Sequence, residues 1–142
     1  MGLTLALVGC GAMGSALLKG WLTLPDSESR FKKIWVIAPH KEKVKPFLKD
    51  SRVEWVDSPD SLSHTPDVIV FAVKPYHLEE ILPHYRRFKS LILSVAAGKS
   101  LSFYEKILSS EQVIVRAMPN PPFRFIRVLL RFLQAKPFLL SK

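Results

Sequence analysis

The stretch Leu3-Thr4-Leu5-Ala6-Leu7-Val8-Gly9-Cys10-Gly11-Ala12-Met13-Gly14 decides the fold. A short apolar run leads directly into three glycines with the spacing G-x-G-x-x-G, and a mostly apolar segment with helical spacing follows over residues 12–24. This order indicates a strand, a tight turn and a helix. Gly9 permits the turn, Gly11 leaves space above the backbone, and Gly14 allows close packing of helix and strand.

Such a loop suits the pyrophosphate of a dinucleotide, because the first N–H groups of a helix have no partner within the helix. We therefore expect cofactor contacts from Gly9, Cys10, Gly11, Ala12, Met13 and Gly14. The alternative is a glycine turn that binds no ligand. Cys10 lies where a small side chain is needed, and we interpret it as structural rather than nucleophilic.

The rest of the chain continues the alternation of strands and helices. Strand-length apolar runs occupy residues 34–37, 53–56, 68–73, 91–95 and 113–115. Residues 77–88 and 101–108 have helical composition, with Pro83 in a first turn or at a kink. Apolar strands separated by helices predict an α/β protein, with a Rossmann-type, mostly parallel sheet covered by helices on both faces. We expect a single domain over residues 1–120.

Composition sets further limits. The chain has 142 residues, 48% hydrophobic and 23% charged, which is globular, and no apolar run approaches the 20 residues of a bilayer-spanning helix. No signal peptide is recognisable, and one cysteine excludes an internal disulfide, so we expect a cytoplasmic protein. The four histidines show no metal-ligand spacing, and no metal is expected.

The net charge of +9 does not indicate a nucleic-acid partner. Five of the 21 basic residues and none of the 12 acidic residues lie in 121–142, which leaves 16 basic and 12 acidic residues in 1–120. A mildly basic domain suits a small anionic ligand as well as a polyanion.

The second strand ends at Ala38, Pro39, His40 and Lys41, without the carboxylate that would bind a ribose 2′-hydroxyl. A 2′-phosphate would be attracted by Lys41, by His40 or by the start of a following helix. The cofactor is therefore predicted to be NADP(H) in preference to NAD(H). Lys43 and Lys45 also fit an exposed helix face that binds nothing.

Two more strand ends border the expected site, because ligands of open α/β sheets lie at the carboxyl ends of the strands. The residues concerned are Ala72, Val73, Lys74 and Pro75 after one strand and Ala96, Ala97 and Gly98 after another. Ser94-Val95-Ala96-Ala97-Gly98 is small enough to leave room for a flat ring, and Lys74 could reach a phosphate or an amide of the cofactor.

Four motifs in this order resemble the N-terminal domain of pyrroline-5-carboxylate reductase over about residues 3–120. They are the glycine loop with Gly20-Trp21, Ala72-Val73-Lys74-Pro75, Ser94-Val95-Ala96-Ala97-Gly98 and Arg116-Ala117-Met118-Pro119-Asn120. The resemblance implies NADPH-dependent, in some members NADH-dependent, reduction of the imine 1-pyrroline-5-carboxylate to proline. It also implies that the nicotinamide lies near Ala96, Ala97 and Gly98, and that Pro119 and Asn120 border the substrate pocket.

The resemblance stops at Asn120, where the family continues into a helical domain for dimer contacts and substrate carboxylate recognition. Residues 121–142 instead form a basic, apolar tail. Restoring one base in a permissive back-translation recovers Thr-Pro and Gly-Val-Thr-Ala segments typical of the family, so we expect an out-of-frame tail on a truncated cofactor half. Homo-oligomerisation, usual for the full-length family, does not carry over to such a product.

Other interpretations remain. Arg124, Arg127 and Arg131 share one helical face, so the tail could be a selected basic amphipathic helix on a non-catalytic nucleotide-binding module, docked on a partner or a membrane. The chain could also be another small NADP-dependent imine or ketone reductase. We assign no catalytic residue, because hydride transfer needs no nucleophile from the protein.

Overall fold

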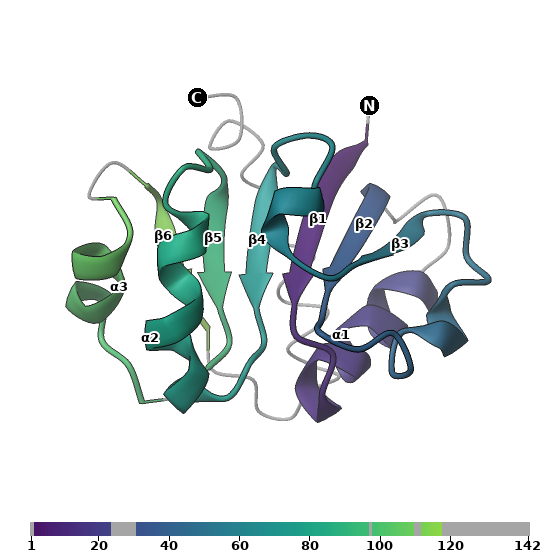
Figure 1. Cartoon of the computed structure of the whole chain (residues 1–142), viewed down its shortest axis with the longest axis horizontal. Helices are drawn as coiled ribbons and strands as arrows, with labels where there is room; N and C mark the ends of the chain where they lie inside the picture. The colour runs from purple at the N-terminus through teal and green to yellow at the C-terminus, as the bar shows by residue number, and fades with distance from the viewer. Residues whose placement is uncertain (1, 24–30, 97, 110–111, 118–142) are drawn as a thin grey trace.

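The computed structural model describes residues 2–23, 31–96, 98–109 and 112–117 (Figure 1). In this part of the chain, parallel strands form one sheet with the order β3-β2-β1-β4-β5-β6. The strands are β1 (Leu3–Val8), β2 (Phe31–Ile37), β3 (Val53–Val56), β4 (Val68–Phe71), β5 (Leu91–Ser94) and β6 (Ile114–Arg116). The strand order confirms the predicted Rossmann-type α/β fold.

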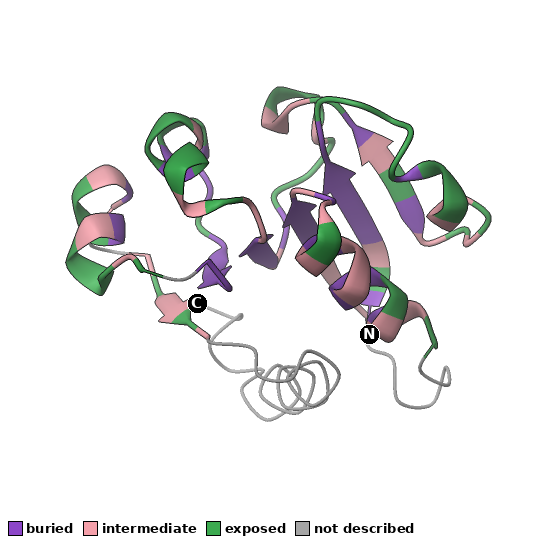
Figure 2. Ribbon diagram, turned by 90° about the horizontal axis from the view of Figure 1, so that it is seen from below, coloured by how far each residue is buried: buried purple, intermediate pink, exposed green. Residues whose placement is uncertain are grey.

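Helices cover both faces of this sheet, as Figure 2 shows in a view along the strands from their carboxyl ends. The helix α1 (Ala12–Thr23) lies on one face, and α2 (Leu78–Ile81) and α3 (Leu101–Ile107) lie on the other. Within the described ranges, four short 3-10 helices lie in the connections: η1 (Lys45–Phe47), η2 (Pro59–Ser61), η3 (Pro75–His77) and η4 (Leu82–Tyr85).

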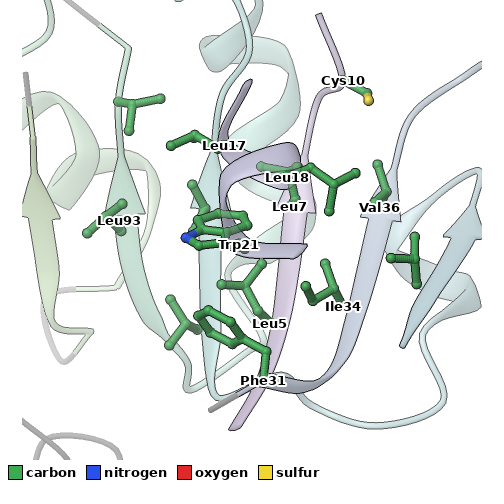
Figure 3. Close-up of a cluster of buried hydrophobic side chains, with 14 of the residues drawn as sticks. Leu5, Leu7, Cys10, Leu17, Leu18, Trp21, Phe31, Ile34, Val36 and Leu93 are labelled. Atoms are coloured by element: carbon green, nitrogen blue, oxygen red, sulfur yellow. The ribbon is translucent and has the colours of Figure 1, made fainter. Parts of the chain in front are cut away.

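Each face of the sheet carries its own apolar core. On the α1 face, Leu17, Leu18 and Trp21 pack over Leu5 and Leu7 of β1 (Figure 3). The second core lies under α2 and α3 and contains Leu78, Leu82, Tyr85 and Tyr104. Every residue of β4 is fully buried, and alternate side chains enter opposite cores. The central strands are therefore apolar along their whole length, as predicted.

The predicted helix over residues 77–88 is wrong as a single element. The chain forms η3, the one-turn α2 and η4 in succession, with prolines in the first turns of both 3-10 helices. Pro83 lacks an N–H and would clash with the carbonyl four residues earlier in a continuous α-helix. Buried Leu78, Leu82 and Tyr85 still anchor the segment with helix-like spacing.

The expected helix after the second strand is also wrong. Among the described residues, the connection from β2 to β3 contains η1, whose Pro46 follows Lys45. Pro46 cannot donate the bond that an α-helix through this segment would need, and the bonds that follow are of the 3-10 type, with the Phe47 N–H donating to Val44 and the Leu48 N–H donating to Lys45. The last strand begins at Ile114 rather than at Val113, which is 44% exposed.

The described residues contain no helix with the length and apolarity of a membrane span. The predicted division into a domain over residues 1–120 and a tail over 121–142 stays a prediction, because residues 118–142 lie outside the described ranges.

Candidate functional site

The glycine loop (residues 9–14) leaves β1 through a turn at Gly9 in which a residue with a Cβ atom does not fit. Gly9 has φ of 99°, in the left-handed region. A Cβ atom there would lie 2.8 Å from Val73 Cγ1 and 3.0 Å from the Ala72 carbonyl oxygen. The Gly9 N–H donates to the Ile37 carbonyl oxygen at 2.9 Å. The loop is thus held between the ends of β2 and β4.

The other two glycines have opposite surroundings. A Cβ at Gly14 would overlap the Gly9 carbonyl oxygen, whereas a Cβ at Gly11 would meet nothing within 4 Å. The Gly11 carbonyl oxygen accepts from the Ser15 N–H at 2.9 Å, so the first turn of α1 starts immediately after Gly11. Gly14 closes the packing of the loop, and Gly11 borders open space beside the free N–H groups of the helix.

Cys10 packs inward and links the glycine loop to the next connection. It is 5% exposed and lies at the margin of the α1-side core (Figure 3). Its Sγ lies 3.5 Å from Ser15 Oγ and donates to the Lys43 carbonyl oxygen at 3.7 Å. These contacts are structural, in agreement with the interpretation of this cysteine from the sequence.

The connection after β2, the basic turn (residues 38–45), is anchored by distant contacts. The Ala38 N–H donates to the Val56 carbonyl oxygen at 3.2 Å, and its own carbonyl oxygen accepts from Trp55 Nε1 at 3.0 Å. Further along, the Lys41 carbonyl oxygen accepts from the N–H groups of Val44 and Lys45 at 2.9 and 3.0 Å. The Val44 side chain is fully buried.

Between these anchors the turn presents positive charge. His40, Lys41 and Lys43 are exposed, together with one carboxylate, Glu42. Ion pairs in the described part of the chain join Lys33 to Glu54, Asp50 to Arg52 and Asp60 to Arg87, so none involves these three residues. Lys41 Nζ lies 5.8 Å from the centroid of the Trp55 ring. Among the described residues, Lys41 and Lys43 therefore form no ion pair, and the three lysines of the turn outnumber its one carboxylate, Glu42.

The connection after β4 completes one side of the loop. Ala72 and Val73 are half-buried, and Lys74 is exposed. The Ala72 N–H donates to the Val8 carbonyl oxygen at 2.9 Å, so this connection starts beside the glycine loop. Pro75 begins η3, whose His77 N–H donates to the Lys74 carbonyl oxygen at 3.0 Å.

The chain that leaves β5 is held by a pair of buried hydroxyl groups, those of Ser94 and Tyr104. Ser94 Oγ and Tyr104 Oη lie 2.6 Å apart, both residues are fully buried, and the Ala96 N–H donates to Ser94 Oγ at 3.3 Å. Burial raises the pKa of Tyr104, and the hydrogen bond with Ser94 and the charge of Arg116 offset this in part. Tyr104 therefore stays protonated at neutral pH and holds Ser94 in place.

Gly98 follows with φ of 84° and open space at the position of a Cβ. It borders a second open surface at the carboxyl edge. Ala97, Pro119 and Asn120 lie outside the described residues, so their predicted roles stay predictions.

The structure brings together the predicted residues that follow β1, β2, β4 and β5, because the carboxyl ends of these parallel strands lie on the same side of the sheet. Figure 2 is viewed from this side. β1 lies between β2 and β4, and it is here that the strand order reverses. Open α/β sheets bind their ligands at this switch point. Two contributors were missed: Trp55 and Tyr104. The strand register and the helix packing that place them join positions far apart in the chain, and no local pattern marks them.

A cavity of about 500 Å³ lies at the other end of the strands, among residues near their amino ends. Its lining includes Thr4, Lys32, Lys33, Glu54 and Asp67. It is shallow and open, its two carboxylates already accept from Lys33 and Thr4, and it is remote from the glycine loop. The described residues contain no group of three potential metal ligands.

Several known proteins resemble this chain in both sequence and fold. A pyrroline-5-carboxylate reductase of Escherichia coli is 31% identical over 125 residues, covering 83% of this chain and 44% of the relative. The reductase structure from Coxiella burnetii has 26% identity and a TM-score of 0.74, covering 87% of this chain and 47% of that one. The Plasmodium falciparum enzyme, solved with NADP bound, has 28% identity and a TM-score of 0.68, with coverages of 86% and 44%.

This chain thus spans less than half the length of these relatives. A family model, described as NADP oxidoreductase, coenzyme F420-dependent, matches residues 4–98, which contain the strands β2 to β5 and all of β1 except Leu3. The chain belongs to this NADP oxidoreductase family, and its resemblance is to the N-terminal domain of pyrroline-5-carboxylate reductase.

Proposed function

We propose that this chain binds NADP(H) and forms the cofactor half of an oxidoreductase that reduces 1-pyrroline-5-carboxylate to proline. The observation that carries the proposal is the glycine loop, where open space above Gly11 faces the first turn of α1. Main-chain N–H groups and the helix dipole favour a pyrophosphate in that space. The NADP-bound Plasmodium falciparum relative supports the choice of cofactor.

The remaining strand ends have chemically suitable positions for the rest of the cofactor. Lys41 provides positive charge for the 2′-phosphate beside Ala38 and Pro39, and the exposed His40 ring can offer it a hydrogen bond. Ala72, Val73, Lys74 and Pro75 border the same loop on the β4 side. Gly98, with open space at the position of a Cβ, follows buried Ala96 and leaves room for the nicotinamide, and the predicted contribution of Ala97 belongs to the same segment.

The cofactor, when bound, supplies the hydride, and the protein has to position it. In this chain the Ser94–Tyr104 pair holds the strand end at which the ring would lie, and the glycines hold the pyrophosphate end. Holding the pyrophosphate and the strand end beside the ring limits the positions that the ring can take, and such positioning is the main contribution of a protein to hydride transfer. No described side chain is assigned as an acid or a base.

Calorimetric titration with NADPH tests the binding part of this proposal, with the Gly11→Val variant as the control. The wild-type chain should release or absorb heat with a saturable 1:1 isotherm, and the variant should not. The absence of a wild-type isotherm would overturn the proposal as a whole.

The reductase part needs a second measurement in the same preparation, which is NADPH oxidation on addition of 1-pyrroline-5-carboxylate. Substrate-dependent oxidation supports a reductase. Binding without oxidation would restrict the function of this chain to cofactor binding, as expected for the alternative of a non-catalytic nucleotide-binding module.

A further inference from the structure

Trp55 joins β3 to the basic turn in two ways. Its indole Nε1–H donates to the Ala38 carbonyl oxygen at 3.0 Å, at the point where the chain leaves β2. Its ring lies below the ammonium group of Lys41, 5.8 Å from Nζ to the centroid. One side chain therefore contacts both the start of the turn and the cation at its tip.

The contact with Ala38 fixes the direction in which the turn leaves the sheet. The Ala38 N–H is already bonded to Val56, so β3 holds both main-chain polar groups of this residue. Ala38 itself is 7% exposed, whereas Pro39, His40 and Lys41 are exposed. The exposed tip thus begins from a fixed, buried point.

The contact with Lys41 restricts a side chain that would otherwise be free to move. A lysine at the surface loses rotamer entropy when a ligand immobilises it. A cation within about 6 Å of a tryptophan ring is attracted to its face, which favours a limited set of lysine rotamers before any ligand arrives. Val44, fully buried, holds the other end of the turn.

We infer that Trp55 is a positioning residue for cofactor selection, which places Lys41 for a ribose 2′-phosphate and so favours NADP(H) over NAD(H). This inference rests on the proposed function, because it presupposes binding of the dinucleotide at the glycine loop. The inference adds Trp55, from β3, to the residues that select the cofactor. Trp55 would not touch the phosphate itself and would act through Lys41.

The test is the ratio of the NADH and NADPH dissociation constants, measured by calorimetry for the wild-type chain, Trp55→Phe and Trp55→Leu. Phenylalanine keeps an aromatic face and loses the N–H donor, and leucine loses both. The ratio should fall about 2- to 5-fold in Trp55→Leu, since a partly exposed cation–π contact is of that strength, and less in Trp55→Phe. A general loss of stability would weaken both cofactors alike and leave the ratio unchanged.

The same substitution in a Lys41→Gln background separates positioning from packing. Trp55→Leu should then leave the ratio unchanged, because the cation through which Trp55 acts is gone. An unchanged ratio in Trp55→Leu alone, or an equal change in both backgrounds, would overturn the inference. Wild-type protein that binds neither cofactor would overturn the proposed function first and is distinguished by that result.

Discussion

The connections after β1 and after β2 lie next to each other at one edge of the sheet but obtain their shapes in different ways. The glycine loop takes its shape mainly from its own main chain, with Gly9 in the left-handed region and Gly14 against the Gly9 carbonyl, and a single main-chain bond from Gly9 to Ile37 attaches it to β2. The basic turn is shaped by distant residues, with Trp55 on Ala38 and buried Val44 in the core. A local motif can therefore build the phosphate site, whereas the site that selects the ribose needs tertiary contacts.

The largest effect is expected from filling the open space of the glycine loop. Gly11→Val should weaken NADPH binding at least about 100-fold, because its side chain would occupy the pyrophosphate position. Its free energy of unfolding should stay near that of the wild type, since no described residue beyond the two chain neighbours lies within 4 Å of the added Cβ. Calorimetry and urea denaturation measure the two quantities. Unchanged NADPH affinity would refute the site.

A second substitution tests whether the loop is shaped by its own main chain. Gly14→Ala should lower the free energy of unfolding by about 1–3 kcal/mol, because the new Cβ meets backbone rather than a movable side chain. Gly11→Ala is the matched control and should change this quantity by less than about 1 kcal/mol. Equal effects of the two alanines would contradict the different packing of Gly11 and Gly14.

Charge reversal in the basic turn should act on one cofactor. Lys41→Asp should weaken NADPH about 5- to 10-fold and NADH less than about 2-fold, because a carboxylate repels the 2′-phosphate that NADH lacks. Lys49→Asp carries the same charge change later in the connection and controls for the field of the whole protein. A uniform loss for both cofactors would remove Lys41 from cofactor selection.

The connection after β5 depends both on a nearby residue and on a residue from another element. Ser94 Oγ accepts from the nearby Ala96 N–H, and Ser94 itself is hydrogen-bonded to Tyr104 of α3. Tyr104→Phe should lower the free energy of unfolding by about 1 kcal/mol through loss of the buried hydrogen bond with Ser94. Tyr76→Phe removes the same hydroxyl from a residue that is 74% exposed and should have almost no effect. Denaturation curves of equal midpoint for both variants would show that the Ser94–Tyr104 contact adds nothing.

The smallest expected effect is on alkaline stability. Burial raises the pKa of Tyr85 and that of Tyr104 above the ordinary tyrosine value, so both favour the fold in their neutral form. This contribution is complete below about pH 10 and is lost as the pH rises further, because the unfolded chain then ionises first. Tyr85→Phe should reduce the fall in unfolding free energy above about pH 10. An identical fall in the variant would exclude Tyr85 as a source.

Much of the fold was predictable because its signals are local. The apolar runs predicted the strands β1 to β5 to within a few residues, and the spacing of residues 9–14 predicted the strand–turn–helix unit. The two helix errors both involve a proline, Pro46 after the second strand and Pro83 within residues 77–88. Composition indicated a helix over residues 77–88, and the helix after the second strand was expected only as the next element, but proline removes a donor that a continuous α-helix needs.

By itself, the sequence determined the parallel α/β fold and the glycine loop, because both depend on apolar patterning and on glycines within a few residues of each other. It also placed Lys41 and Ser94 at strand ends. Only the tertiary structure showed that Trp55 contacts Ala38 and Lys41 and that Tyr104 contacts Ser94. Those contacts depend on the pairing of β2 with β3 and on the packing of α3 over β5, which join residues distant in the chain and leave no local pattern.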